Sequence, residues 1–164
     1  APDAMADYLE FRAALEGESA AFAAERASPA EQERIAGADA AMAAAVRRGD
    51  LDAAATADVE FHMAIVEAAG NLVAIQVARS LHELLRRGVE RSHRLSSGDA
   101  DAWADLSAQH GPITAAIADR DAAAARRAMR AHLERQGAML GQAEKRAVRD
   151  ALDARRRAWA AEAG

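Results

Sequence analysis

The chain has 164 residues, a formal net charge of -5 and no cysteine, and 51% of its residues are hydrophobic although only 4% are aromatic. The length is typical of one domain, and the acidic balance argues against a surface that binds nucleic acid by itself, because such binding depends on neutralising phosphates. The lack of cysteine excludes a disulfide framework and a thiolate metal site, and no apolar run approaches the roughly 20 residues that span a bilayer. We therefore expect a cytoplasmic protein whose metal ligands, if it has any, are His and carboxylates.

Residues with high helix propensity, above all Ala, dominate the composition, while β-branched residues are sparse. This composition predicts an all-α fold, and the spacing of Gly, Pro and capping residues divides the chain into about six to seven helices. The first helix should run from Ala4 to Ala27. Large apolar residues recur along it at helical spacing and predict its buried face: Tyr8, Phe11, Leu15 and Phe22.

The boundary between the first two helices is marked by a Ser-Pro pair. Ser28 can cap the second helix, Pro29 fits its first turn, and Glu31 follows Ser28 by three residues, which is the spacing of a capping box. The second helix should end near Gly49. Asp50 then provides the side chain expected to cap the third helix.

The third helix should stop at Gly70, because glycine readily adopts the left-handed conformation that ends helices. Asn71 opens the fourth helix, and the fifth begins near Trp103. Pro112, which follows a glycine, falls inside the fifth helical pattern, so we expect a kink or a fresh start there. Asp121 should cap the sixth helix, which an Arg-rich stretch follows.

Four residues of metal-ligand type interrupt apolar stripes that should face the core: Asp58, His62, His110 and His132. Asp58 and His62 are four residues apart and therefore lie on one face of the third helix. His110 and His132 occupy inward positions of two later helices. The pattern predicts that three helices bring these side chains to one point.

A buried carboxylate without a partner is costly, so a cation should lie beside Asp58. The ligand set suits one divalent ion such as Zn, Ni, Mn or Fe and does not choose among them. The alternatives are an Asp–His hydrogen-bonded core network, a metal-dependent helical-bundle enzyme and a metal-free helical interaction module. An enzyme is disfavoured because no second metal set is evident and no further inward carboxylate is clear, apart from Glu16.

Two stretches resemble the FCD domain, the C-terminal effector domain of FadR-type regulators in the GntR family. The segment DVEFHMAIVEAAGN, from Asp58 to Asn71, is similar to the family's D-x-x-F-H pattern followed by G-N. The segment from His110 to Leu133 is similar to its later stretch, which ends in A-x-x-x-M-x-x-H-L. The resemblance implies an antiparallel bundle whose metal is held by Asp58 and the three His residues.

The resemblance also implies a domain organisation and a set of partners. Residues 1–143 would form the metal- and effector-binding domain, residues 144–164 an Arg-rich helix or tail, and the winged-helix DNA-binding domain would be absent from this chain. The expected partners are a small organic acid, a second copy in a homodimer, and operator DNA only through the absent domain, with no membrane contact.

We expect the effector to contact Arg12, Asn71 and His82. A guanidinium can bind a carboxylate through two parallel hydrogen bonds. The alternative for Arg12 is an ion pair with Glu16, one turn away, on a solvated face. His82 and His93 each also fit a purely structural role.

Overall fold

The computed structural model describes residues 2–81 and 100–162 of the chain. Its elements are α1 (Pro2–Arg26), α2 (Pro29–Arg48), α3 (Leu51–Ala68), a helical segment at 72–81, α5 (Ala100–Ala118) and α6 (Ala122–Glu162). Every element of the described residues is a helix, which confirms the all-α prediction. None of these helices is both long and apolar enough to cross a membrane.

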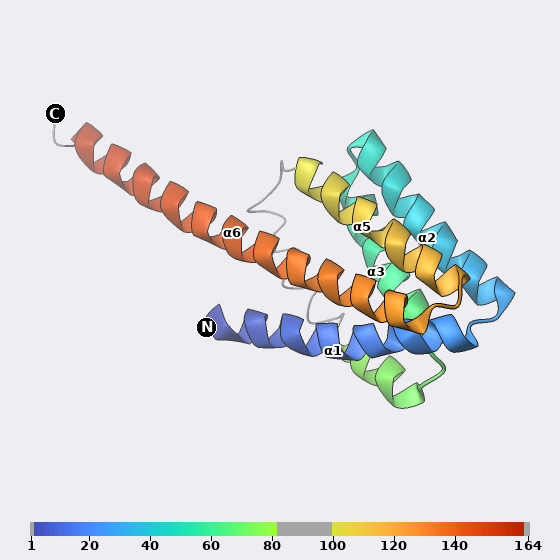
Figure 1. Cartoon of the computed structure of the whole chain (residues 1–164). Helices are drawn as coiled ribbons and strands as arrows, with labels where there is room; N and C mark the ends of the chain where they lie inside the picture. The colour runs from blue at the N-terminus through green and yellow to red at the C-terminus, as the bar shows by residue number, and fades with distance from the viewer. Residues whose placement is uncertain (1, 82–99, 163–164) are drawn as a thin grey trace.

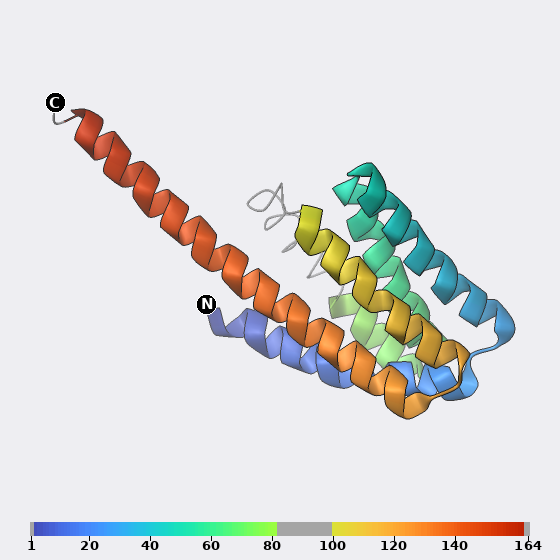
Figure 2. The ribbon, with the colours of Figure 1, turned by 45° about the horizontal axis from the view of Figure 1, so that its top comes forward.

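The helices pack as an antiparallel bundle (Figure 1). α1 packs mainly against α6, and α2 packs mainly against α3, while α5 contacts both α2 and α6. The first half of α6 lies along α1, whereas its C-terminal part projects beyond the N-terminus of α1 (Figure 2). The predicted C-terminal stretch is thus a continuation of α6, a single helix of 41 residues.

The predicted capping residues occupy the helix ends. Ser28 and Glu31 form the complete capping box of α2, and the Asp50 carboxylate accepts a hydrogen bond from the Ala53 amide at 3.0 Å. Gly49 and Gly70 have φ values of 71° and 70°, in the left-handed region that glycine enters without strain. These local signals therefore placed the ends of α2 and α3 to within about two residues.

The expected break at Pro112 does not restart the chain: α5 is one helix from Ala100 to Ala118. Proline lacks the N–H that would bond to the carbonyl of Ala108. Pro112, Gly111 and Ala108 are all exposed, so water can satisfy that carbonyl. The missing hydrogen bond falls on the outer face of α5, and the inward aim of His110 is preserved.

The predicted buried face of α1 is wrong. Phe11 is 50% exposed, and Tyr8, Leu15 and Phe22 are only half-buried. The face that meets the other helices combines two charged residues, Arg12 and Glu16, with small side chains: Ala20, Ala23, Ala24 and Ala27. Small residues on this face let α1 approach its neighbours closely, and the larger side chains lie on its flanks.

The packing of α1 on α6 shows how close this approach is. A Cβ atom placed on Gly137 would lie 3.2 Å from Leu9 Cδ1, so even one added methyl group would force a shift there. Further along, the Glu18 carboxylate accepts two hydrogen bonds of 2.8 Å from Arg126. The two helices are therefore held in one antiparallel register.

Ala24→Leu should lower the free energy of unfolding by about 1–3 kcal/mol, because extra volume at a fully buried position forces its neighbours apart. Ala14→Leu on the exposed side of α1 is the matched control and should change it by less than about 0.5 kcal/mol. Urea denaturation measures both values, and equal effects of the two substitutions would contradict the buried position of Ala24.

Candidate metal centre

Four potential ligands converge in the interior of the bundle. Asp58 and His62 come from α3, His110 from α5 and His132 from α6, and one donor atom from each lies within 4.8 Å of all the others. The three His residues are at most 1% exposed, and Asp58 is 9% exposed. The structure thus brings together the four residues whose sequence pattern aimed them at one point.

The separations between donor atoms fit a shared ion. His62 Nε2 lies 3.2 Å from His132 Nε2 and 3.7 Å from Asp58 Oδ1. His110 Nε2 lies 3.2 Å from the same Asp58 oxygen. Ligands about 2.1 Å from one ion, at tetrahedral or octahedral angles, are separated by about 3.0–3.4 Å, or about 4.2 Å when opposite. These three separations are close to those of ligands that share one ion, and all four donors lie within 4.8 Å of one another.

A closed hydrogen-bond network does not account for these residues. Asp58 Oδ1 and both ring nitrogens of His110 are buried and have no hydrogen-bond partner within the described part of the chain. The 3.2 Å approach of His110 to Asp58 lacks the alignment of a hydrogen bond. Because unpaired buried polar atoms are costly, this donor set fits a bound cation better than an Asp–His network.

The protonation states also suit metal binding. Burial alone would raise the pKa of the Asp58 carboxyl, but the three imidazoles, His110 above all, hold this pKa well below its usual range. Burial, reinforced by the neighbouring His62, lowers the pKa of His132 to about 3. Asp58 is therefore ionised and His132 neutral at physiological pH, as ligands must be.

Neighbouring side chains fix the orientation of the imidazole rings. Phe61, fully buried on α3, stacks on the His110 ring with a centroid distance of 3.9 Å and an interplanar angle of 12°. His132 Nδ1 lies 3.3 Å from the Gln109 side-chain oxygen, a hydrogen bond that leaves Nε2 of His132 facing the cluster. Each ring thus turns one nitrogen towards the common space.

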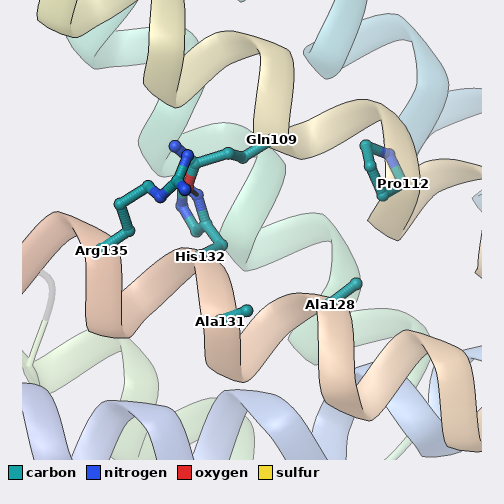
Figure 3. Close-up of a pocket in the computed structure, with 6 residues that line it drawn as sticks. All are labelled: Gln109, Pro112, Ala128, Ala131, His132 and Arg135. Atoms are coloured by element: carbon teal, nitrogen blue, oxygen red, sulfur yellow. Dashed lines mark hydrogen bonds between the residues drawn. The ribbon is translucent and has the colours of Figure 1, made fainter.

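A small hollow of about 190 Å³ lies beside His132, between α5 and α6 (Figure 3). Its lining combines polar and small side chains: Gln109, Pro112, Ala128, Ala131, His132 and Arg135. The Arg135 guanidinium is more than half exposed and lies 3.4 Å from Asp105. Of the four potential ligands, His132 is the one that lines this hollow.

Arg12 is buried, which corrects the interpretation of a solvated face. Its side chain is 3% exposed and forms a two-pronged pair with Glu16, at 2.6 Å from Nε to Oε1 and 3.2 Å from Nη2 to Oε2. Arg12 Nη1 also donates to the Gln136 side-chain oxygen on α6 at 3.0 Å. The predicted i,i+4 pair exists, but it lies in the core of the bundle.

Glu16 is the site residue that the sequence pattern left unassigned. Its Oε2 lies 2.6 Å from His62 Nδ1, so it touches one of the four potential ligands directly. Burial alone would raise the pKa of Glu16, but Arg12 and then His62 hold it well below its usual range. The signal that could have found it is its place in line with Leu9, Arg12 and Ala20, all inward residues of α1.

The other two residues predicted to contact the effector are Asn71 and His82. The exposed Asn71 accepts hydrogen bonds from the amides of Val73 and Ala74 at 3.0 and 3.1 Å, which makes it the N-cap of the helical segment 72–81. It lies beyond the end of α3, nine residues after His62 in the chain. His82 and His93 lie outside the described residues.

Comparisons with known proteins agree with this geometry. The profile of the FCD domain family matches residues 7–135. The chain is 38% identical over 132 residues to the "Putative L-lactate dehydrogenase operon regulatory protein" of Escherichia coli strain K12, covering 80% of this chain and 50% of that protein, and equally to its Shigella flexneri counterpart. The chain thus spans about half the length of these curated relatives.

The fold is also found among solved structures. McbR/YncC of E. coli superposes with a TM-score of 0.74 over 83% of this chain and 67% of that one, at 18% sequence identity. At this level of identity the likeness concerns the fold alone. It supports the helical architecture that brings α1, α3, α5 and α6 together.

The pKa of His132 predicts how stability depends on pH in metal-free protein. Its folded value of about 3 lies below the ordinary 6.5, so the unfolded chain binds more protons between these values. The free energy of unfolding should therefore fall as pH drops below 6.5, by up to about 1.4 kcal/mol per pH unit. Denaturation between pH 7 and pH 5 measures this, in a range where Asp and Glu are mostly ionised.

His132→Asn is the matched variant, since it removes the titrating ring and keeps a polar side chain. Its unfolding free energy should vary less between pH 6.5 and pH 5 than that of the wild type. An unchanged slope in this variant would show that the acid sensitivity comes from elsewhere.

Proposed function

Because this chain belongs to the FCD domain family, the effector-binding domain of GntR-type transcription regulators, we propose that it senses a small carboxylate beside a divalent metal ion. The ion would be held by Asp58, His62, His110 and His132. The family is one of transcription regulators, and this domain is not an enzyme. The convergence of four donor atoms in the core carries the proposal.

The metal would be a Zn, Ni, Mn or Fe ion, because imidazole and carboxylate ligands suit all of these. Three neutral imidazoles and one carboxylate give a divalent centre a net charge of about +1, which favours a monoanionic partner in a mostly apolar interior. An ion that accepts more than four ligands has a position left for a carboxylate oxygen of the effector. When bound, the metal would supply charge and a binding position, and the protein would supply the selectivity.

Arg12 is the proposed side-chain partner of the effector, with Asn71 and His82 as further contacts. Arg12 already holds Glu16, so its Nη1, which donates to the neutral Gln136 oxygen, is the group that can be exchanged. A ligand carboxylate that replaces Gln136 there gains a charge-assisted hydrogen bond and leaves the buried Arg12–Glu16 pair intact. Since the E. coli relative is named for an L-lactate dehydrogenase operon, lactate is the first acid to test.

The regulatory output is proposed to lie outside this chain. The chain covers half of its curated relatives and is acidic, so we assign operator binding to a winged-helix domain elsewhere in the parent protein. Within this chain, we propose that residues 1–143 form the sensing unit and residues 144–164 an Arg-rich helical extension. We further propose that the protein acts in the cytoplasm as a homodimer. Effector binding would alter how the dimer presents its DNA-binding domains.

Purified protein loaded with Zn²⁺ and dialysed should retain one equivalent of metal per chain. His62→Ala and His132→Ala should each lower this content strongly, because each removes one of four ligands, and Asp52→Ala on the exposed face of α3 is the matched control. Elemental analysis measures the ratio. A wild-type content below about 0.2 equivalents, or His variants equal to Asp52→Ala, would rule the site out.

Calorimetry with lactate and a panel of small hydroxy- and dicarboxylic acids should find an acid that binds metal-loaded protein at least tenfold more tightly than metal-free protein, about 1.4 kcal/mol in binding free energy. Arg12→Lys keeps the buried charge but loses the planar fork, so it should weaken binding about tenfold. Gln136→Ala removes only the group that the carboxylate replaces and should bind at least as tightly as the wild type.

Two results would contradict this assignment. An acid that binds equally well without metal would place the effector away from the ion. An affinity of Arg12→Lys within about twofold of the wild type would exclude Arg12 as its partner.

A further inference from the structure

Glu16 occupies a position that neither a surface pair nor a metal ligand explains. It lies on α1 with 2% of its surface exposed, and it is not one of the four residues whose donor atoms converge. Its Oε2 contacts Nδ1 of His62, a residue 46 positions later on α3, at 2.6 Å. The contact joins two helices at the nitrogen of His62 that faces away from the cluster.

The Glu16 carboxylate is held in place from its other side. Arg12 binds both of its oxygens, and Arg12 is itself tied to α6 through Gln136. Side chains from α1 and α6 therefore fix the carboxylate, and it cannot turn away from His62 without leaving a buried guanidinium unpaired. Burying the Arg12 and Glu16 charges costs desolvation free energy, and a contact between Ala-lined helices would avoid this cost.

The chemistry of the contact decides which nitrogen of His62 carries hydrogen. An ionised carboxylate can only accept hydrogen bonds, so Nδ1 of His62 must be the donor at 2.6 Å. In neutral imidazole, Nε2 then has a free lone pair. That Nε2 is the atom which faces His132 at 3.2 Å and Asp58 at 3.7 Å.

We propose that Glu16, anchored by Arg12, is the positioning residue of the metal centre: it fixes the tautomer and the ring orientation of His62. The inference rests on the metal site proposed above. A carboxylate bonded to the distal nitrogen of a ligating His raises its basicity and limits its rotation, and loss of such a partner commonly weakens metal binding about 10–100-fold. The buried Arg12–Glu16 pair therefore serves the site and not only the packing of α1.

The test compares Zn²⁺ affinities, measured by competition with a chromogenic chelator and without any organic acid. The double variant Arg12→Met with Glu16→Leu removes the acceptor and both buried charges together, a replacement that core ion pairs often tolerate. Its affinity should fall about 10–100-fold. Glu16→Gln keeps an acceptor oxygen without the charge and should lose less.

Glu18→Gln is the matched control. Glu18 lies two residues later on α1 and also pairs with an arginine, Arg126 of α6, but its side chain is 45% exposed and does not touch the cluster. The same substitution there should leave Zn²⁺ affinity within about twofold of the wild type.

A second measurement separates positioning from folding. Nitrogen-15 NMR of the His side chains in metal-free protein should show His62 protonated on Nδ1 in the wild type and in Glu18→Gln. In the double variant this preference should be lost, an effect that a merely structural role of Glu16 would not produce.

A double variant that keeps both the wild-type tautomer and an affinity within about twofold of the wild type would overturn the proposal. If this variant fails to fold, Glu16→Gln decides, and an affinity equal to that of Glu18→Gln would overturn it. If the wild type itself binds no Zn²⁺, the proposed function fails, whereas the tautomer measurement still tests the contact between Glu16 and His62.

Discussion

The central constraint on this domain is the burial of charge within a helical core. Among the described residues, two buried carboxylates, Glu16 and Asp58, accompany a single buried arginine, Arg12, so the interior holds one more acidic side chain than it holds arginines. A buried carboxylate destabilises a folded chain by several kcal/mol unless a cation lies beside it. The three imidazoles around Asp58 provide lone pairs directed at one point, so a cation that balances the Asp58 charge can also be coordinated there.

The Ala-rich helices are what make so crowded a polar centre possible. Donors from three helices, with Glu16 of a fourth behind His62, can meet only where the backbones come close, and the inward faces of α1 and α6 are small at the points of contact, including Gly137 against Leu9. The larger apolar side chains that remain inside, such as Phe61 and Met129, surround the His cluster or fill the adjoining core. The interior thus consists of the polar His cluster and an adjoining apolar core.

The sequence predicted the ligand set better than it predicted the surroundings of the set. Asp58, His62, His110 and His132 stand out because each breaks an apolar stripe, and periodicity gives the inward direction of each stripe. Arg12 and Glu16 give a weaker signal: they lie in line with inward residues of α1, but a charged i,i+4 pair is equally typical of a solvated helix face. Their burial depends on the approach of α6, a contact between residues 124 positions apart that no local pattern contains.

The same reasoning explains the errors at α1 and α5. Periodicity assigns the largest hydrophobic residues to the buried face, so it predicts burial of Phe11. The closest helix contacts favour small side chains, and Ala20 is buried instead. Pro112 led us to expect a kink or a fresh start, and the fresh start does not occur because the carbonyl that loses its partner is exposed to water. Both errors arise where tertiary packing, and not helix propensity, decides what a residue does.

The contacts of the centre span sequence separations of 46 between Glu16 and His62, 70 between His62 and His132, and 124 between Arg12 and Gln136. Contacts this distant close longer loops, at a greater cost in chain entropy, than the local contacts between α2 and α3. During synthesis, the residue that completes the donor set, His132, is also the last of the four to leave the ribosome. The complete set of donors therefore exists only in a chain whose last helix has docked, so a nascent or truncated chain would lack it.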